Sequence, residues 1–524
     1  IKKIMIIIGI MLLMLIIKSP ISRAETTYQA GENVTAVLDD QGTLTISGTG
    51  AMSYEEVPWI NERKSIKKVV IQNGVTFIRD RAFSDCSSLT QITIPSSVVS
   101  IESRAFSYCS SLTQITIPSS VVSIESYAFE FCGLTQITIP SSVVSIGSRA
   151  FSDCSSLTQI TIPEGVKNID SSVFERCSSL TQITIPSSVV SIGYSAFSGC
   201  SSLTQITIPS SVVSIGGSAF SYCSSLTQIT IPSSVVSIGS SAFSYCSSLT
   251  QITIPEGVKT IGYNVFKRCG SLTQITIPSS VVSIESYAFE FCGLTQITIP
   301  SSVTEISRAA FANCLNLSEI KVEEANTKYV SENGILFNKE KTEIIAYPGG
   351  KKDITYAIPK GVTSIKGDTF YSCSSLKQIT IPSSVTSIGG MAFWGCKNLT
   401  QITIPSSVTS IGDMAFVRCS SLKEITIPSS VTSIGEMAFA RSDKTIVLTS
   451  KGSYTDTYCK DNNINRITYS TINWTNENVD IELNENKVYT FTKNGETTIE
   501  YTYDKDGETN KENAIVKVTN IDKE

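Results

Sequence analysis

The stretch LTQITIPSSVVSIESRAFSYC, from Leu89 to Cys109, decides the fold because it recurs through most of the chain. Its first seven residues, LTQITIP, occur eleven times, and the variants LKQITIP and LKEITIP raise the total to thirteen. The cysteine that ends the stretch recurs at a spacing of 23 residues, or 22 where one residue is lost. A fixed period of this length is typical of a solenoid, in which each period forms one turn, or rung.

Each part of the period predicts one piece of a rung. Leu89, Ile92 and Ile94 alternate with polar residues, which predicts a strand with one buried face. Pro95 follows directly, and a residue without an N–H suits the place where ladder pairing stops. One rung alone cannot bury enough apolar surface to offset the entropy of ordering it. Neighbouring rungs must therefore stack, through an inter-rung hydrogen-bond ladder and columns of equivalent side chains.

The second half of the period closes the coil. A second short extended piece is expected to point Val98 and Ile101 inward, and a tight turn or single helical turn carries Ala105, Phe106 and Cys109. A glycine follows the second isoleucine in many rungs and is expected to provide the φ freedom that a corner needs. Examples of this glycine are Gly147, Gly193 and Gly239.

These units resemble the BspA-like leucine-rich repeat family, whose pattern is LxxIxIPxxVxxIGxxAFxxC. The resemblance covers Ile66 to about Ser470 and implies a β-rich α/β leucine-rich-repeat solenoid. That fold is a right-handed coil with one long parallel sheet and short helical turns. The stretch LDDQGTLTISGTG (Leu38–Gly50), with Pro58 and Trp59, resembles the N-terminal cap of that family. Capping also fits the physics, since a bare terminal rung would be an open sheet edge.

The domain boundaries follow from shifts in composition. Lys2 and Lys3, an apolar run to Ile17 and small residues up to Ala24 describe a signal peptide at 1–24. A β cap is expected at 25–65 and the solenoid at 66–450, with a hairpin insertion at about 325–352 that turns at Asn338–Lys341. A C-terminal cap with one short helix is expected at 451–470. Residues 471–524 contain KVYTFTKNGETTIEYTYDKDGE and AIVKVTNIDKE, and resemble an immunoglobulin-like, β-sandwich-like module, which at this length is expected to be either small or incomplete.

Composition excludes several kinds of chemistry. The 524 residues contain no histidine, which removes Ser-His-Asp triads, Cys-His dyads and imidazole zinc sites. A formal charge of −5 without basic clusters argues against a nucleic-acid partner. The acidic pair Glu125 and Glu130 recurs as Glu285 and Glu290, so these acids follow the duplication of a block, whereas an active site is normally unique. We therefore expect no enzyme, no cofactor and no metal, and membrane contact only during export.

The cysteines form a second candidate for chemistry. Equivalent cysteines one rung apart would place their Cα atoms about 4.8 Å apart, within the range of a disulfide. Stacked side chains point the same way, however, so the favoured interpretation is a structural column of buried free thiols, with disulfides or a metal as alternatives. The fifteenth cysteine, Cys459, is off this register. The column comprises Cys86, Cys109, Cys132, Cys154, Cys177, Cys200, Cys223, Cys246, Cys269, Cys292, Cys314, Cys373, Cys396 and Cys419.

Binding is the remaining class of function. The outward residues of the repeated strand, as in Thr90, Gln91 and Thr93, predict polar ladders along one face. Such ladders are either only solubilising or a multivalent surface whose weak contacts add. Departures from the repeat are better candidates for specificity. The aromatic residues before several cysteines either anchor a partner or stack rung on rung, and stacking is favoured. Examples are Tyr108, Phe131, Tyr222, Tyr245 and Phe291. The candidate ligand-binding residues are Thr93, Thr116, Thr138, Thr161, Thr184, Glu319, Lys321, Lys377, Lys423 and Glu424.

The sequence thus predicts a secreted or cell-surface protein that binds other proteins. The family resemblance implies adhesion to host extracellular matrix, such as fibronectin and fibrinogen, or to other cells. One alternative is a structural spacer or surface-layer component whose repeats do not bind. Another is a carbohydrate-active solenoid enzyme, which would need a unique acidic cluster on adjacent rungs.

Overall fold

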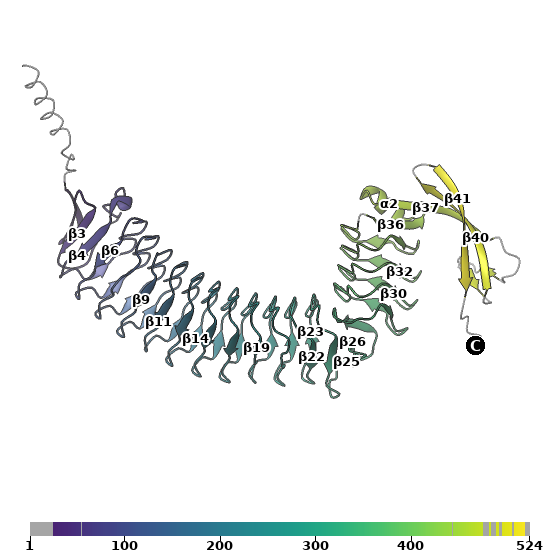
Figure 1. Cartoon of the computed structure of the whole chain (residues 1–524), viewed down its shortest axis with the longest axis horizontal. Coiled ribbons are helices and arrows are strands. Elements are labelled where there is room, and N and C mark those ends of the chain that lie inside the picture. Colours follow the sequence, from purple (N-terminus) through teal and green to yellow (C-terminus); the bar gives the residue numbers. More distant parts are fainter. Residues whose placement is uncertain are drawn as a thin grey trace, which may run out of the picture. The chain divides into compact units, whose positions relative to one another are not determined.

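The computed structural model describes residues 25–53, 55–442, 444–474, 481–483, 489–491, 495–505 and 508–518. The chain divides into two compact units, Ile1–Val281 (unit 1) and Val282–Glu524 (unit 2). The signal peptide predicted at 1–24 lies outside the described residues. In both units, short strands of successive rungs lie beside one another, as Figure 1 shows.

The first ladder of unit 1 consists of parallel strands in register. Ile160 lies opposite Ile137 on one side and Ile183 on the other, so every rung places the same residue at the same point. We call its solvent-facing side the sheet face. Its strands are β6 (Gln91–Thr93), β9 (Gln136–Thr138), β11 (Gln159–Thr161), β13 (Gln182–Thr184), β15 (Gln205–Thr207), β17 (Gln228–Thr230) and β19 (Gln251–Ile252).

The second extended piece of each rung forms a ladder of its own. Two-residue strands pair in parallel with their copies one rung away, as Ser191 and Ile192 do with Ser214 and Ile215. The solenoid thus has two parallel ladders, which corrects the expectation of one long sheet. These strands are β5 (Phe77–Ile78), β7 (Ser100–Ile101), β8 (Ser123–Ile124), β10 (Ser145–Ile146), β12 (Asn168–Ile169), β14 (Ser191–Ile192), β16 (Ser214–Ile215), β18 (Ser237–Ile238) and β20 (Thr260–Ile261).

The segment that carries Ala105, Phe106 and Cys109 is a series of tight turns, the first of the two predicted alternatives, and not a helical turn. The N–H groups of Ala105 and Cys109 bond within the rung, to carbonyls three residues back, whereas those of Arg104, Phe106 and Tyr108 donate to the next rung. Turning every second N–H outward requires left-handed backbone, with φ of 53° at Arg104 and 63° at Tyr108. This pair of left-handed positions recurs in nearly every rung of both units.

The glycine after the second isoleucine serves a different purpose from the one predicted. Gly193 and Gly239 are not among the residues with positive φ. A Cβ at Gly239 would lie 2.3 Å from the backbone nitrogen of Gly217 in the preceding rung. Close approach of two backbones therefore favours glycine at this corner, and the left-handed φ lies elsewhere.

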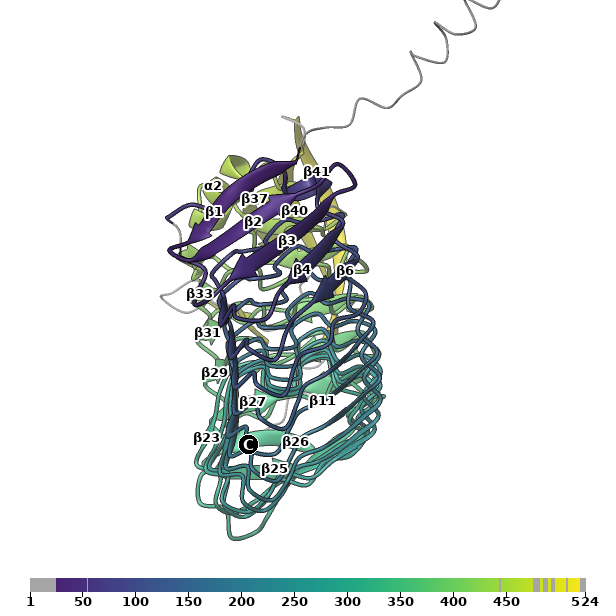
Figure 2. The ribbon, with the colours of Figure 1, turned by 90° about the vertical axis from the view of Figure 1, so that its left-hand side faces the viewer.

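The N-terminal cap is a meander that continues the first ladder. Strands β1 (Thr26–Gly31), β2 (Val34–Leu38) and β3 (Thr43–Gly48) are antiparallel, and β3 runs parallel to β4 (Lys68–Ile71), as Figure 2 shows. A short 3-10 helix, η1 (Arg63–Ser65), precedes β4. Trp59 is fully buried, donates from Nε1 to the carbonyl of Ala82 at 2.8 Å and stacks on Phe83 at 6.1 Å.

The core between the ladders is built from columns of identical residues. The phenylalanines equivalent to Phe106 stack from Phe83 to Phe266 with ring centroids 5.3–5.9 Å apart. Leu89, Val98, Ile101 and their copies are buried beside them, as predicted. Each rung thus gains its buried surface from its neighbours rather than from itself.

Unit 2 repeats both ladders. The first comprises β22 (Gln296–Ile299) with β24 (Glu319–Val322), and then β28 (Thr355–Ala357), β30 (Gln378–Thr380), β32 (Gln401–Thr403), β34 (Glu424–Thr426), β36 (Ile446–Ser450) and β37 (Arg466–Trp474). The second comprises β21 (Ser283–Ile284) with β23 (Glu305–Ile306), and then β27 (Glu343–Ala346), β29 (Ser364–Ile365), β31 (Ser387–Ile388), β33 (Ser410–Ile411) and β35 (Ser433–Ile434).

The insertion in unit 2 is a three-stranded meander. Strands β25 (Tyr329–Glu332) and β26 (Ile335–Asn338) turn at Asn333-Gly334, both with positive φ, and β26 pairs antiparallel with β27 after the predicted turn at Asn338–Lys341. Because β27 then pairs in parallel with β29, the meander returns the chain to the second ladder.

The C-terminal end of the solenoid carries a helix, as the sequence predicts. Helix α2 (Tyr454–Asp461) begins after Ser453, whose hydroxyl accepts a hydrogen bond from the N–H of Asp456. Strand β37 crosses the boundary predicted at 470/471 and pairs antiparallel with β40 (Gly495–Lys505), which pairs with β41 (Glu508–Val518). Strands β38 (Ile481–Leu483) and β39 (Tyr489–Phe491) form a separate pair. The immunoglobulin-like module stays a prediction.

Candidate functional site

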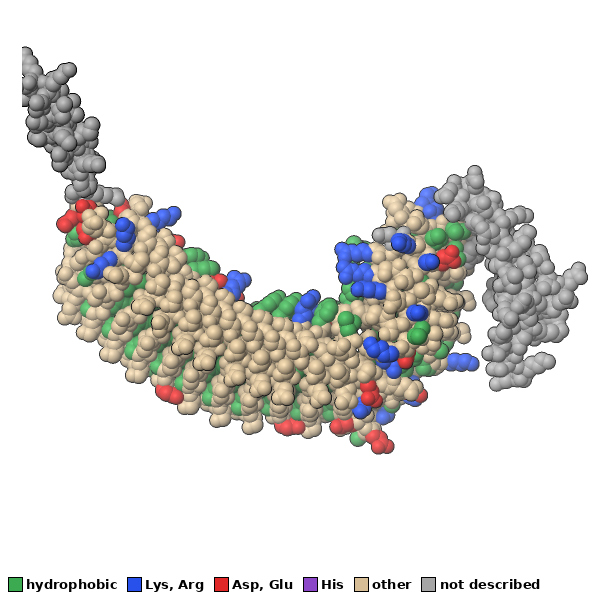
Figure 3. All heavy atoms as spheres, in the orientation of Figure 1, with side chains coloured by type: hydrophobic (Ala, Val, Ile, Leu, Met, Phe, Trp, Pro, Cys, Tyr) green, Lys and Arg blue, Asp and Glu red, His purple; other side chains and the backbone are tan. Residues whose placement is uncertain are grey.

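The sheet face of unit 1 is a ladder of Gln and Thr side chains. In strands β9 to β17 the glutamine and the threonine are exposed, and the isoleucine between them is buried. Figure 3 shows uncharged polar side chains and backbone over most of the visible face of this unit, with few charged groups. We call this surface the Gln/Thr ladder. It offers the same amide and hydroxyl at every rung, about 4.8 Å apart.

All five predicted threonines lie on this ladder and are exposed. Thr93 ends β6, Thr138 ends β9, Thr161 ends β11 and Thr184 ends β13. Thr116 forms an isolated bridge with Thr138. In contrast, the hydroxyls of the threonines that precede each strand are engaged by the backbone, as Thr158 Oγ1 donates to the Thr135 carbonyl at 3.0 Å.

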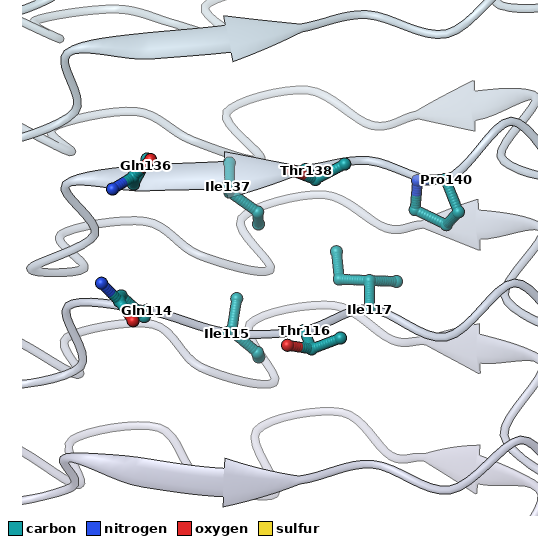
Figure 4. A pocket seen from close by; sticks show the side chains of 8 residues that line it. All are labelled: Gln114, Ile115, Thr116, Ile117, Gln136, Ile137, Thr138 and Pro140. Atoms are coloured by element: carbon teal, nitrogen blue, oxygen red, sulfur yellow. The ribbon is translucent and has the colours of Figure 1, made fainter.

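The ladder opens at one point. Between the rung of Thr116 and the rung of Thr138 lies a hollow of about 430 Å³, where an isolated bridge joins Thr116 to Thr138 and Thr135 N donates to the Thr113 carbonyl at 3.0 Å. Figure 4 shows Gln114 beside Gln136 and Thr116 beside Thr138, with Ile115 and Ile137 between them. No charged side chain lines this hollow. It can hold a small polar group but provides no acid or base for catalysis.

The charged candidates all lie in unit 2, in two places. Glu319 and Lys321 occupy the glutamine and threonine positions of β24, and their side chains pair at 3.4 Å. Lys321 Nζ also lies 3.4 Å from Gln296 Oε1. Lys377 and Lys423 are exposed and precede β30 and β34, one residue before the strand. Glu424 begins β34.

The sequence interpretation missed three lysines beside Lys377 and Lys423. Lys352, Lys397 and Lys444 are exposed and lie on the intervening and flanking rungs, in the corner between the cysteine turn and the strand. Hydrogen bonds join these rungs, as Lys377 N donates to the Ile354 carbonyl at 2.7 Å and Ser421 N to the Lys397 carbonyl at 3.1 Å. We call this set the lysine corner: Lys352, Lys377, Lys397, Lys423 and Lys444.

Two further surface features follow from the same register. Tyr108 stacks on Phe131 at 4.6 Å, and Tyr222 stacks on Tyr245 at 4.2 Å, which confirms the predicted stacking. The second ladder exposes a column of valines that the sequence interpretation did not single out. The column comprises Val122, Val144, Val190, Val213 and Val236.

The cysteine column lies inside the solenoid. All fifteen cysteines are buried without a disulfide, Cys459 included. In unit 1 from Cys109 onward, each sulfur lies 3.0–3.2 Å from the phenylalanine carbonyl of the preceding rung and donates to it. Burial raises the pKa of the Cys154 thiol to about 12, which disfavours the reactive thiolate. Ser442 continues the column, and its Oγ donates to the Phe416 carbonyl at 2.8 Å.

The two recurring acids lie in different surroundings. Glu125 is exposed, whereas Glu130 is buried, and burial raises the pKa of the Glu130 carboxyl. Ser107 Oγ donates to Glu130 Oε2 at 3.5 Å. Within the described part of the chain, no group of three or more Cys, Asp or Glu side chains is placed to hold a metal ion. No helix in that part is long and apolar enough to cross a membrane.

Comparisons with solved structures find similar bacterial proteins, two of them described as leucine-rich. A leucine-rich cell surface protein from Faecalibacterium prausnitzii A2-165 is 28% identical, with a TM-score of 0.45, over 83% of this chain and 97% of that chain. A leucine-rich repeat protein from Bacteroides ovatus is 23% identical, with a TM-score of 0.41, over 86% and 99%. The pneumococcal vaccine antigen PcpA is 17% identical, with a TM-score of 0.33, over 86% and 100%. No curated protein sequence matches the chain.

The repeats themselves match a family model described as a BspA type leucine-rich repeat region of six copies. The matches run over residues 61–180, 122–250, 169–282, 236–357 and 352–465. Together they cover 61–465, well over half of the 524 residues. The chain therefore belongs to the BspA-type leucine-rich repeat family.

Proposed function

We propose that this chain is an exported surface protein that binds other proteins through the Gln/Thr ladder. The observation that carries the proposal is the ladder itself, a face on which exposed Gln and Thr recur in register from β9 to β17 with no charge among them. Export is supported by the N-terminal sequence pattern alone.

The chemistry of the ladder favours binding over catalysis. A face that repeats one amide and one hydroxyl forms many weak hydrogen bonds, and these add because each is held close to the next. The chain contains no histidine, and its acidic pair recurs with the duplicated block. Host matrix proteins and surface proteins of other cells are the partners that the family resemblance suggests.

The proposal is tested by placing charges on the ladder at alternate rungs. In the variant Thr138→Glu, Thr184→Glu and Thr230→Glu, each carboxylate would have to lose its hydration in any interface that covers the ladder. The full chain and the variant are immobilised and challenged with matrix proteins and intact cells. We expect saturable retention by the parent chain and at least a tenfold loss of affinity in the variant.

A matched control places the same charges on the same rungs but on the other ladder. Val144→Glu, Val190→Glu and Val236→Glu alter side chains that are 57%, 41% and 58% exposed. Retention that survives the threonine variant and fails in the valine variant would move the site to the second ladder. No retention by the well-folded parent chain would favour a structural spacer, in which the repeats provide only length.

A further inference from the structure

We propose that the lysine corner of unit 2 binds a linear polyanionic glycan, one whose sulfate or phosphate groups recur along a polysaccharide chain. This inference goes beyond the proposed function, because the corner lies in unit 2 and does not require the Gln/Thr ladder of unit 1 to bind a protein.

The corner presents one exposed lysine on each of five consecutive rungs. Lys377 and Lys423 share the column of Ile354 and Thr400. Hydrogen bonds link these rungs, with Thr400 N 2.9 Å from the Lys377 carbonyl and Ile446 N 2.7 Å from the Lys423 carbonyl. Lys397, three residues before Thr400, lies on the rung between them. Lys352 and Lys444 extend the set by one rung at each end. At about 4.8 Å per rung, the five ammonium groups span roughly 19 Å.

Lysines on five consecutive rungs occur in this part of unit 2, whereas in unit 1 the equivalent position is lysine at Lys67, whose carbonyl accepts from Thr90 N at 2.9 Å. At the same positions after Cys109, Cys154, Cys177, Cys200, Cys223 and Cys246, the rungs of unit 1 carry only Ser and Thr. The repeat therefore folds without these lysines, and packing gives no reason for five of them to be adjacent. Their mutual repulsion acts within the Debye length of about 8 Å and works slightly against the fold.

Few acids offset this charge. Lys351, which directly precedes Lys352, is not part of the corner. Its side chain is only 15% exposed, and its Nζ lies 3.5 Å from Asp353 and 2.9 Å from the Asn333 carbonyl, so it contacts other parts of the fold. Glu424 follows Lys423 directly. A chain of net charge −5 thus concentrates positive charge on one edge. This edge attracts polyanions, whereas the negative net charge of the rest of the chain repels them.

The neighbouring side chains favour a glycan over an acidic peptide. Ser374, Ser375, Asn398 and Thr400 surround the lysines with hydroxyl and amide groups, which suit the hydroxyls of a sugar. Protein interfaces are anchored by buried aromatic or aliphatic side chains. Among the described positions of the corner, Ile354 is the one exposed aliphatic side chain. Lysine is a mobile point charge that adapts to successive anionic groups, which again suits a polymer.

The test uses immobilised heparin and the full chain, with all five lysines of the corner changed to Gln in one variant. The matched control changes five exposed lysines of unit 1 to Gln, namely Lys64, Lys67, Lys68, Lys167 and Lys259. We expect the corner variant to lose at least tenfold in affinity at low salt and to elute at lower salt, while the control behaves as the parent chain. Five lost contacts should reduce the slope of log K against log salt by about 3.5, at roughly 0.7 per contact.

Each other outcome overturns the proposal. Equal losses in both variants would mean unspecific attraction of charge, and no loss in the corner variant would mean that heparin binds elsewhere. Stronger competition by poly-glutamate than by free heparin would assign the corner to an acidic protein segment. The variant Thr138→Glu, Thr184→Glu and Thr230→Glu should keep its heparin retention, so failure of the ladder proposal is distinguishable from failure of this one. Teichoic acid in place of heparin separates a phosphate polymer from a sulfated one.

Discussion

At the scale of single residues, the most unusual feature is left-handed backbone at non-glycine positions. The residue before the alanine and the residue before the cysteine have positive φ in nearly every rung, although Arg, Tyr, Ser and Met occupy them. Each such residue costs roughly 1–2 kcal/mol relative to an ordinary conformation. The solenoid tolerates this cost because the strained N–H groups join successive rungs.

A pair of substitutions at Ser218 measures this strain. Its φ is 55°. Ser218→Gly should stabilise unit 1 by about 1 kcal/mol, because glycine adopts this conformation freely. Ser218→Val should destabilise it by about 2 kcal/mol, because a β-branched residue is a genuine outlier at positive φ. Ser240 is the control position. Its carbonyl accepts the hydrogen bond from Ser218 N at 2.8 Å, and its own φ is not positive. Ser240→Gly should therefore destabilise unit 1 more than Ser240→Val does. Urea unfolding followed by circular dichroism measures both pairs, and the same order at both positions would contradict this account.

At the scale of elements, Asn326 joins the meander β25–β26–β27 to the solenoid. Its side chain is 1% exposed and makes four hydrogen bonds. Nδ2 donates to the carbonyls of Pro300 and Val303 at 2.8 and 3.0 Å, and Oδ1 accepts from the N–H groups of Lys328 and Tyr329, both at 2.8 Å. A buried amide satisfied on both sides thus helps to position the first strand of the meander, together with Val330, which packs against the core.

Asn326→Asp should loosen this meander. The isosteric carboxylate keeps the two accepting contacts but places an oxygen where Nδ2 donates, beside two carbonyls. We expect a loss of about 2–3 kcal/mol in the local free energy of opening, which is the cost of a buried unsatisfied group. Amide hydrogen exchange should therefore accelerate in β25 and β26 and stay unchanged in β6 to β17 of unit 1. The exposed Asn398 is the control position for the same substitution, and equal effects at both positions would refute the role of burial.

At the scale of the whole molecule, the repeat is modular because each rung bonds only to its neighbours. Deletion of residues 201–223, one full period, joins Cys200 to Ser224 and leaves every column in register. We expect this variant to fold and its melting temperature to change by only a few degrees. Deletion of residues 201–211, about half a period, should abolish the cooperative transition in circular dichroism, since it moves inward-facing residues to the surface. Equal stability of the two variants would contradict a solenoid built on register.

Much of this fold was predictable because every rung repeats the same hydrophobic pattern, so each feature of the rung is indicated many times over. The alternation of Leu89, Ile92 and Ile94 and the return of Cys109 every 23 residues give the strand, the inward face and the stacking. The turn was not predictable from the same pattern, because its left-handed positions carry ordinary side chains and glycine lies where two backbones approach.

The candidate site was predictable only in part. The threonines of the ladder follow from alternation and lie where they were expected. Lys352, Lys397 and Lys444 were missed because they occupy different columns, and an insertion separates Lys352 from the last rung before it. Its register is fixed by the pairing of β28 with β30 and by the hydrogen bond from Lys377 N to the Ile354 carbonyl.

The in-register Gln/Thr ladder also has a statistical consequence for any partner that it binds. A protein with an ordinary footprint of about 800 Å² covers roughly six rungs, so only one or two copies fit on a unit. The same partner nevertheless has several equivalent registers, each one rung from the next. Three such registers, as a six-rung footprint has on the eight rungs from β6 to β19, would contribute RT ln 3, or about 0.7 kcal/mol of apparent affinity, without any new contact. A bound partner would also be able to move from one rung to the next before it dissociates. The surface would then offer a series of overlapping equivalent positions rather than one fixed binding site.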